Sequence, residues 1–287
     1  MKKLLRFQLA IMLGAALISL PSCKKEMEDD NDDTMSITEK IIMPAQALTV
    51  ASPGNSSSQD YNTFYGPQTQ MGNGHARSWI NISRENNQPL AIGIEFSQGA
   101  MNNLPTNPLD FAASTFVLTL HQKAKEVTPF DHITLNWEPN GHEPNGIYDV
   151  PHFDMHFYKI SVTDQMAITG APTAPPAAGY LPVQYVIQGA TVPQMGTHWL
   201  NPASPELPPT LAPFTHTMIY GTNTARVIFI EPMITRAFLL AGTQVNMAIP
   251  QPVHFEPANT YYPQQYSIWK NADNGRNYVA LNNFAWR

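Results

Sequence analysis

Cysteine is almost missing from this chain, which limits how the fold can be stabilised. Cys23 is the only cysteine among 287 residues, so an intramolecular disulfide is excluded. Charged residues are also scarce at 13%, the net charge is −6, and no stretch of the chain forms a basic stripe. Nucleic acid is therefore not an expected partner.

Several enzyme motifs are absent as well. The chain has no glycine–serine nucleophile elbow, no phosphate-binding loop and no dinucleotide-binding fingerprint. Helical periodicity is rare, whereas prolines number 26. This composition favours a turn-rich β protein over a helical one.

The first residues have the pattern of a secretory signal. Three positive charges within residues 1–6 precede an apolar run at residues 7–20, which is too short for a stop-transfer helix. The sequence LPSC at residues 20–23 resembles a bacterial lipoprotein signal. This resemblance implies that residues 1–22 are a signal peptide and that Cys23 is lipidated. An ordinary signal peptide with a cysteine near its cleavage site is the alternative.

A polar, mostly acidic stretch follows, KKEMEDDNDD at residues 24–33. It cannot bury a core, so we expect residues 23–40 to be a solvated, lipid-anchored tether. Acidic residues directly after the lipidated cysteine resemble the surface-export signals of Bacteroidota lipoproteins. The resemblance implies an anchor in the outer membrane of the cell envelope and display on its outer face, with a plain spacer as the alternative.

Short β-rich runs bounded by proline, glycine and asparagine recur in the rest of the chain. Their spacing predicts an all-β fold in which residues 41–287 form a single antiparallel sandwich or barrel. A jelly-roll or cupin-like topology is compatible with this prediction. Short helical turns are expected only at residues 110–113 and 235–240. The expected strands are residues 78–83, 90–96, 115–120, 132–137, 153–162, 185–188, 214–220 and 227–230.

The stretch GHEPNGIYDVPHFDMHFYKI at residues 141–160 is the richest in candidate ligands. In a strand, alternate residues share a face, so His152, Asp154 and His156 would lie together, opposite an apolar face. Imidazoles and a carboxylate at this spacing can surround one divalent ion, and calcium is disfavoured because it prefers oxygen ligands. His142 and Glu143 precede a turn that can fold them over the same face as further ligands. A hydrogen-bonded polar cluster and an exposed strand face are the alternatives.

Two later segments offer residues that would complete such a site. His198 follows a tight turn at Gly196 and is a further candidate ligand, with a packing role as the alternative. Glu231 is expected to end an apolar strand, where an unpaired carboxylate is costly. It is therefore a candidate anionic ligand or general base, and a glutamate bonded to backbone donors is the alternative. Asp154 and His216 are expected to orient the ligand histidines from outside the coordination shell.

These segments together resemble an uncharacterised family of exported bacterial proteins, a domain of unknown function. The residues that carry the resemblance are GHEPNGIYDVPHFDMHFY, MGTHW with NPASPEL, and FTHTMIYG with FIEPMIT, within about residues 115–240. The resemblance implies a β-rich fold but no agreed reaction. The site that it implies consists of His142, Glu143, His152, His156, His198 and Glu231. Gly146 and His152 are similar to the opening of a cupin metal motif, but Asp154 stands where cupins have their second histidine, so cupin membership is not expected.

Two functions are compatible with these observations. The first is an envelope lipoprotein that binds a divalent ion of the zinc, iron or manganese type and an unknown small molecule, where the ion would act as a Lewis acid or activate water. The second is a non-catalytic surface module that binds a ligand or assembles into a homo-oligomer. Its contacts would come from Trp79, Trp137, Trp199, Tyr261, Tyr262 and Trp269.

Overall fold

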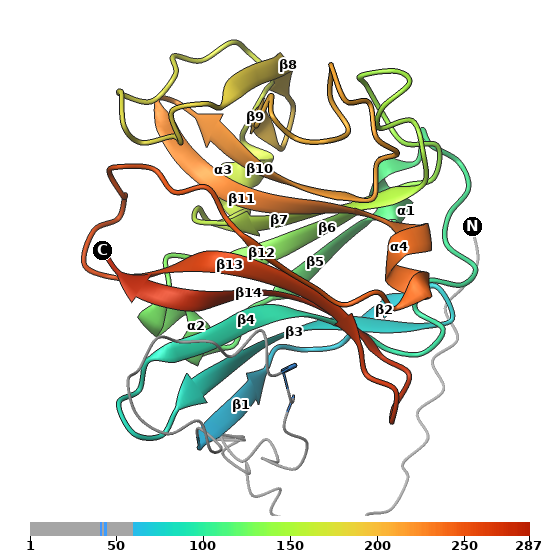
Figure 1. Cartoon of the computed structure of the whole chain (residues 1–287), viewed down its shortest axis with the longest axis vertical. Helices are drawn as coiled ribbons and strands as arrows, with labels where there is room; N and C mark the ends of the chain where they lie inside the picture. Colours follow the sequence, from blue (N-terminus) through green and yellow to red (C-terminus); the bar gives the residue numbers. More distant parts are fainter. Residues whose placement is uncertain (1–40, 42, 45–59) are drawn as a thin grey trace, which may run out of the picture. The chain divides into compact units, whose positions relative to one another are not determined.

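The computed structural model describes residues 41, 43–44 and 60–287, which are mainly β-strands joined by loops and four short helices (Figure 1). The strands are β1 (Tyr61–Tyr65), β2 (Thr69–Met71), β3 (Gly74–Ser83), β4 (Pro89–Phe96), β5 (Thr115–Thr119), β6 (His132–Glu138), β7 (His152–Tyr158), β8 (Val186–Val192), β9 (Gly196–Leu200), β10 (His216–Asn223), β11 (Arg226–Thr235), β12 (Val245–Ala248), β13 (Tyr261–Lys270) and β14 (Asn277–Trp286). The helices are α1 (Phe111–Ser114), α2 (Gln122–Val127), α3 (Val162–Met166) and α4 (Arg236–Ala241).

The strands form two seven-stranded antiparallel sheets that pack face to face (Figure 1). The first sheet has the order β1-β3-β4-β14-β13-β12, and β2 pairs with β3. The second has the order β5-β6-β7-β11-β10-β9-β8. In the described part of the chain both sheets end in edge strands, so the predicted all-β sandwich is confirmed and the barrel alternative is wrong.

The main core lies between the sheets and depends on the alternation of each strand. In β7, Phe153, Met155 and Phe157 are fully buried in this core. The rings of Phe153 and Phe96 lie 5.8 Å apart and join the second sheet to the first. Burying each such side chain stabilises the fold by roughly 1.5–3 kcal/mol. The predicted apolar face of this strand is therefore packed as expected.

The limits of two strands differ from the prediction. β7 ends at Tyr158 instead of continuing to residue 162, because the Ser161 hydroxyl caps α3 by accepting a hydrogen bond from the Asp164 backbone N–H at 3.1 Å. β11 extends to Thr235, so Glu231 lies inside the strand and not at its end. Pro232 is tolerated there because the ladder to β7 is interrupted between Ile230 and Met233.

The predicted helical turns at residues 110–113 and 235–240 correspond to α1 and α4, which Asp110 and Thr235 cap. Several elements were missed: α2, α3, β1, β2, β9, β12, β13 and β14. β13 was missed because YYPQQYSIWK contains a proline and adjacent glutamines that hide the strand alternation. In the described residues, no helix is long and apolar enough to cross a membrane. The predicted signal peptide, Cys23 and the predicted tether lie outside the described residues.

Truncating Phe153 tests how far the two sheets depend on this core. We expect Phe153→Ala to lower the free energy of unfolding by about 3–5 kcal/mol, because the cavity between the sheets cannot collapse fully. The matched control is Phe111→Ala, since Phe111 is 61% exposed, and it should change stability by less than about 0.5 kcal/mol. Urea unfolding measures both, and equal effects would contradict this description of the core.

Candidate metal centre

The candidate ligands lie on the outer face of the second sheet, opposite the main core. His152, Asp154 and His156 alternate with the core residues of β7 and are all buried, with at most 4% of each residue exposed. The register of β7 and β11 places Glu231 opposite His156, because Ile230 pairs with Phe157. His198 comes from β9, two strands beyond β11. A second apolar cluster that includes Tyr148, Leu207 and Phe214 covers part of this face.

His156, His198 and Glu231, which we call the Glu231 triad, bring three potential ligand atoms together. The two histidine Nε2 atoms lie 3.4 Å apart. Oε2 of Glu231 lies 3.6 Å from Nε2 of His156 and 3.7 Å from Nε2 of His198. Ligands bonded to zinc at about 2.0–2.1 Å in a tetrahedron are separated from one another by about 3.3 Å. The triad is therefore close to the spacing that a tetrahedral ion requires.

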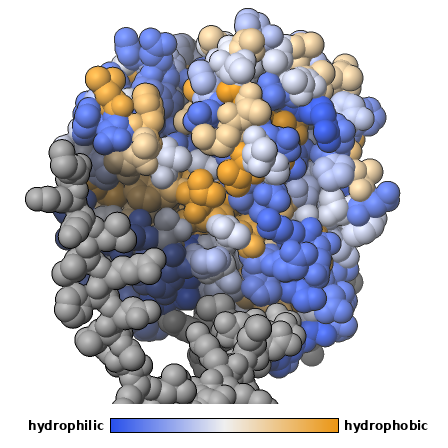
Figure 2. Space-filling model, turned by 180° about the vertical axis from the view of Figure 1, so that it is seen from behind, coloured by the Kyte–Doolittle hydropathy of each residue, from blue (hydrophilic) through white to orange (hydrophobic). Residues whose placement is uncertain are grey.

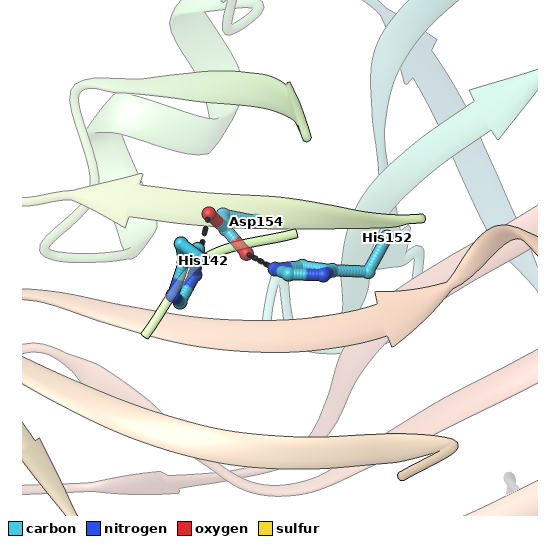
Figure 3. Close-up of side chains that lie close together, drawn as sticks. All are labelled: His142, His152 and Asp154. Atoms are coloured by element: carbon cyan, nitrogen blue, oxygen red, sulfur yellow. Dashed lines mark ion pairs between the residues drawn. The ribbon is translucent and has the colours of Figure 1, made fainter. Parts of the chain in front are cut away.

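His142, His152 and Asp154, which we call the Asp154 triad, form a second group (Figure 3). His152 is on β7 beside Asp154, and His142 reaches them from the loop between β6 and β7. Nε2 of His152 lies 3.1 Å from Oδ1 of Asp154, and Nε2 of His142 lies 3.4 Å from Oδ2. The six predicted residues thus do not surround one ion: five of them, with Asp154, form two groups.

Both triads contribute to one cavity of about 590 Å³. Asp154 and His142 line it from one triad, and His198 and Glu231 from the other. This volume is typical of a site for a small molecule. In the part of the chain that the structure describes, no lysine or arginine lines the cavity, whereas carboxylates and apolar side chains do. Its charge would not attract an anionic ligand unless bound cations supplied the attraction.

The lining of the cavity is partly apolar. Phe111 and Val192 belong to it, and both are exposed. Figure 2 shows the rear face of the molecule with its hydrophobic side chains gathered in the upper half, which is the half that holds the second sheet. A ligand in this cavity would therefore contact both apolar side chains and a few polar groups, which is the usual composition of a small-molecule site.

Burial keeps the histidines of the Glu231 triad neutral. Loss of solvent, with the nearby charge of His198, lowers the pKa of His156 to about 3. Burial lowers the pKa of His198 to about 4. Burial and the negative charge of Asp154 raise the pKa of Glu231 well above its ordinary value. Neutral imidazoles are the form that binds a metal ion, and a bound cation would return the Glu231 carboxyl group to its ionised form.

The Asp154 triad has the opposite electrostatics. Burial acts to raise the pKa of Asp154, but the positive charges of His152 and His142 hold it well below its ordinary value. Burial acts to lower the pKa of His142, and Asp154 outweighs it and raises that pKa to about 10. Burial, with the charge of Asp154, raises the pKa of the neighbouring Glu138 to about 7. Without a metal, this triad is held by charge pairing.

Three predicted roles change in the structure. Glu143 contributes its backbone carbonyl, which accepts hydrogen bonds from Nδ1 of His142 at 2.7 Å and Nε2 of Gln188 at 3.0 Å. His216 faces the opposite side of the sheet, where its Nδ1 lies 2.8 Å from the Tyr266 hydroxyl, so it cannot orient the ligand histidines. Asp154, expected outside the coordination shell, stands at the centre of its own triad.

Glu138 was missed by sequence reasoning. It lies opposite His152 in the β6–β7 pairing and lines the cavity. The signal was present, because residue 138 continues the alternation of the predicted strand at residues 132–137. The glutamate was overlooked because that strand was expected to end one residue earlier.

The aromatic residues nominated for surface contacts are mostly unavailable. Trp79, Trp137, Trp269 and Tyr262 are buried, with at most 8% of each residue exposed. Trp79 and Trp269 pack edge to face at 6.1 Å in a small cluster of their own. Only Trp199 and Tyr261 of the six are partly exposed. The four buried aromatic side chains therefore stabilise the fold and are not exposed for contact with a partner.

The pKa of His198 makes stability depend on pH. In chelator-treated protein, lowering the pH from 6.5 to 4 should lower the free energy of unfolding, because the unfolded chain then binds a proton that buried His198 does not. In the His198→Gln variant this loss should be smaller by roughly 2–3 kcal/mol. The exposed His254→Gln variant should keep the parent profile. Identical profiles for all three proteins, measured by urea unfolding, would contradict the assignment.

The comparisons with known proteins reach only one part of this architecture. Residues 85–137 match the TTHB210-like family, described as hypothetical protein TTHB210. No curated protein and no solved structure matches the chain. The matched segment includes β4, β5 and most of β6, and it contains none of the six triad residues. The chain is thus similar, over residues 85–137, to an uncharacterised family.

Proposed function

We propose that the protein binds one divalent ion at the Glu231 triad, on the wall of a cavity that holds a small molecule. The observation that carries this proposal is the separation of 3.4–3.7 Å between the three ligand atoms of His156, His198 and Glu231. Two imidazole nitrogens and one carboxylate oxygen are a donor set for zinc or iron, and the spacing favours a tetrahedral ion of the zinc type.

A hydrogen-bonded polar cluster is the competing explanation, and its distances are poor. Oε2 of Glu231 is buried without a hydrogen-bond partner, although two ring nitrogens lie within 3.7 Å of it. The contact of 3.4 Å between the two Nε2 atoms exceeds the usual range of about 2.7–3.2 Å for a ring N–H donor. A cation between the three atoms would compensate for these weak contacts.

The ion would act together with the cavity. His198 and Glu231 both line it, so the open side of the ion would face a bound molecule. A divalent ion in such a position supplies Lewis-acid activation of a ligand oxygen or of water. The buried Glu231 carboxylate and the two neutral imidazoles hold the ion. The partly apolar walls of the cavity would limit the access of bulk water.

The location of the protein is part of the same proposal. The secretory pattern at residues 1–22 and the LPSC sequence support a lipoprotein of the cell envelope that is anchored to the outer membrane through Cys23. The acidic segment after Cys23 would place the folded domain at a distance from that membrane.

Metal binding is tested on protein stripped with a chelator and titrated with Zn²⁺ by calorimetry and elemental analysis. We expect His198→Ala to lose one equivalent of Zn²⁺ and to weaken binding at that site by about 100-fold or more, since outer-shell changes alone cost 10–100-fold. The control is His254→Ala, which removes an exposed histidine and should bind as the parent does. No Zn²⁺ binding by the parent protein would refute the proposal.

The lipid anchor is tested separately by Cys23→Ala in the native host. The variant should no longer incorporate labelled fatty acid and should move from the membrane fraction to the soluble fraction, because no other cysteine can replace Cys23. Normal acylation and fractionation of the variant would show that the LPSC sequence is not a lipidation site.

A further inference from the structure

We infer that the Asp154 triad holds a second divalent ion, so that the cavity contains a two-metal centre. This inference rests on the proposed function and deepens it, because both ions would face the same bound molecule. The ligands of the second ion would be Nε2 of His142, Nε2 of His152 and the carboxylate of Asp154, another set of two histidines and one carboxylate.

The backbone orients both histidines of this triad as it does in metal sites. Nδ1 of His152 lies 2.7 Å from the carbonyl oxygen of Val150, and Nδ1 of His142 lies 2.7 Å from that of Glu143. A carbonyl oxygen can only accept, so each Nδ1 must carry the proton that it donates. Nε2 is then the ring nitrogen of each histidine that faces Asp154, where it would be a ligand atom once an ion displaced its proton. Metal-bound histidines are usually oriented by this kind of hydrogen bond from the other ring nitrogen.

Two atoms at the centre of the triad lack proper hydrogen bonds. Nε2 of His152 and Oδ1 of Asp154 are buried and face each other at 3.1 Å, but the angles are not those of a hydrogen bond. The two residues are 0% and 4% exposed, so water does not satisfy these atoms from outside. Leaving buried polar atoms without good partners costs free energy. An ion bound to both atoms would remove that cost.

The two triads are close enough to act on one ligand. Asp154 and His156 are two residues apart on the same face of β7, which places their backbones about 6.5–7 Å apart. His142 and Asp154 line the cavity together with His198 and Glu231. In phosphatases and nucleases paired ions lie about 3.5–4 Å apart and share one substrate oxygen, so two ions at the wider spacing of these triads would contact separate groups of one ligand. Glu138 lines the cavity beside the Asp154 triad and offers an additional carboxylate.

The charge of the cavity supports a second cation. Asp154, Glu231 and Glu138 line the cavity and carry three carboxyl groups, and no lysine or arginine lines it in the described part of the chain. The side chains of His142 and His152 lie 3.4 and 3.1 Å from the carboxylate oxygens of Asp154. A divalent ion bound to these three side chains would compensate the carboxylate and also present open coordination positions to a ligand.

The number of bound ions tests this inference. The full chain, stripped with a chelator, is titrated with Zn²⁺ alone, and bound zinc is counted by elemental analysis. We expect two equivalents in the parent, one in His142→Ala, one in His198→Ala and none in the double variant. His142 lies in a loop and its side chain is 35% exposed, so its removal leaves the sheets intact. Asp154→Asn, checked for folding by circular dichroism, is a second variant that should also bind one equivalent.

Glu143→Ala is the matched control, because it removes a neighbouring carboxylate of the same loop but keeps the carbonyl oxygen that orients His142. It should bind two equivalents. If the parent binds one equivalent that His198→Ala abolishes and His142→Ala leaves intact, the second ion is refuted and the proposed function stands. If the parent binds none, or binds one that only His142→Ala abolishes, the proposed function fails as well.

Discussion

The two-residue period of β7 links the stability of this protein to its candidate chemistry. Phe153, Met155 and Phe157 are buried between the sheets, and the residues between them lie on the opposite face, where Asp154 lines the cavity. A strand fixed by its apolar face cannot slip by one residue, because that would exchange the two faces. The aromatic core therefore fixes His152, Asp154 and His156 on the outer face of the second sheet.

The two buried carboxyl groups at the cavity have opposite pKa shifts. Asp154 is stabilised as an anion by His142 and His152, whereas Glu231 has only neutral imidazoles beside it and its pKa is raised. The negative charge of Asp154 contributes to that rise, so the ionised Asp154 disfavours ionisation of Glu231. Bound cations would compensate the negative charge of both carboxyl groups. The cavity thus contains buried ionisable groups, whereas the main core is formed by apolar side chains.

The sequence predicted part of this arrangement for clear physical reasons. Alternation in residues 153–157 identified the strand, its packed face and three of the triad residues. The same reasoning failed where tertiary packing overrides local pattern: Glu231 was placed at the end of a strand, and β13 was hidden by Pro263 and two glutamines. His216 was assigned to the site although its parity in β10 turns it toward Tyr266. Its partner lies 50 residues away, which no local pattern reveals.

The sequence alone established the chemistry of the candidate donors, which are histidines and carboxylates rather than cysteines, spaced by two in a strand. The tertiary structure determined how those donors are grouped. Local spacing suggested one site, because His142, His152 and His156 are near one another along the chain. The pairing of β11 with β7 placed Glu231 beside His156, β9 brought His198 to both of them, and the loop before β7 brought His142 to Asp154. Contacts across strands are set by register and loop path, and these are properties of the whole structure.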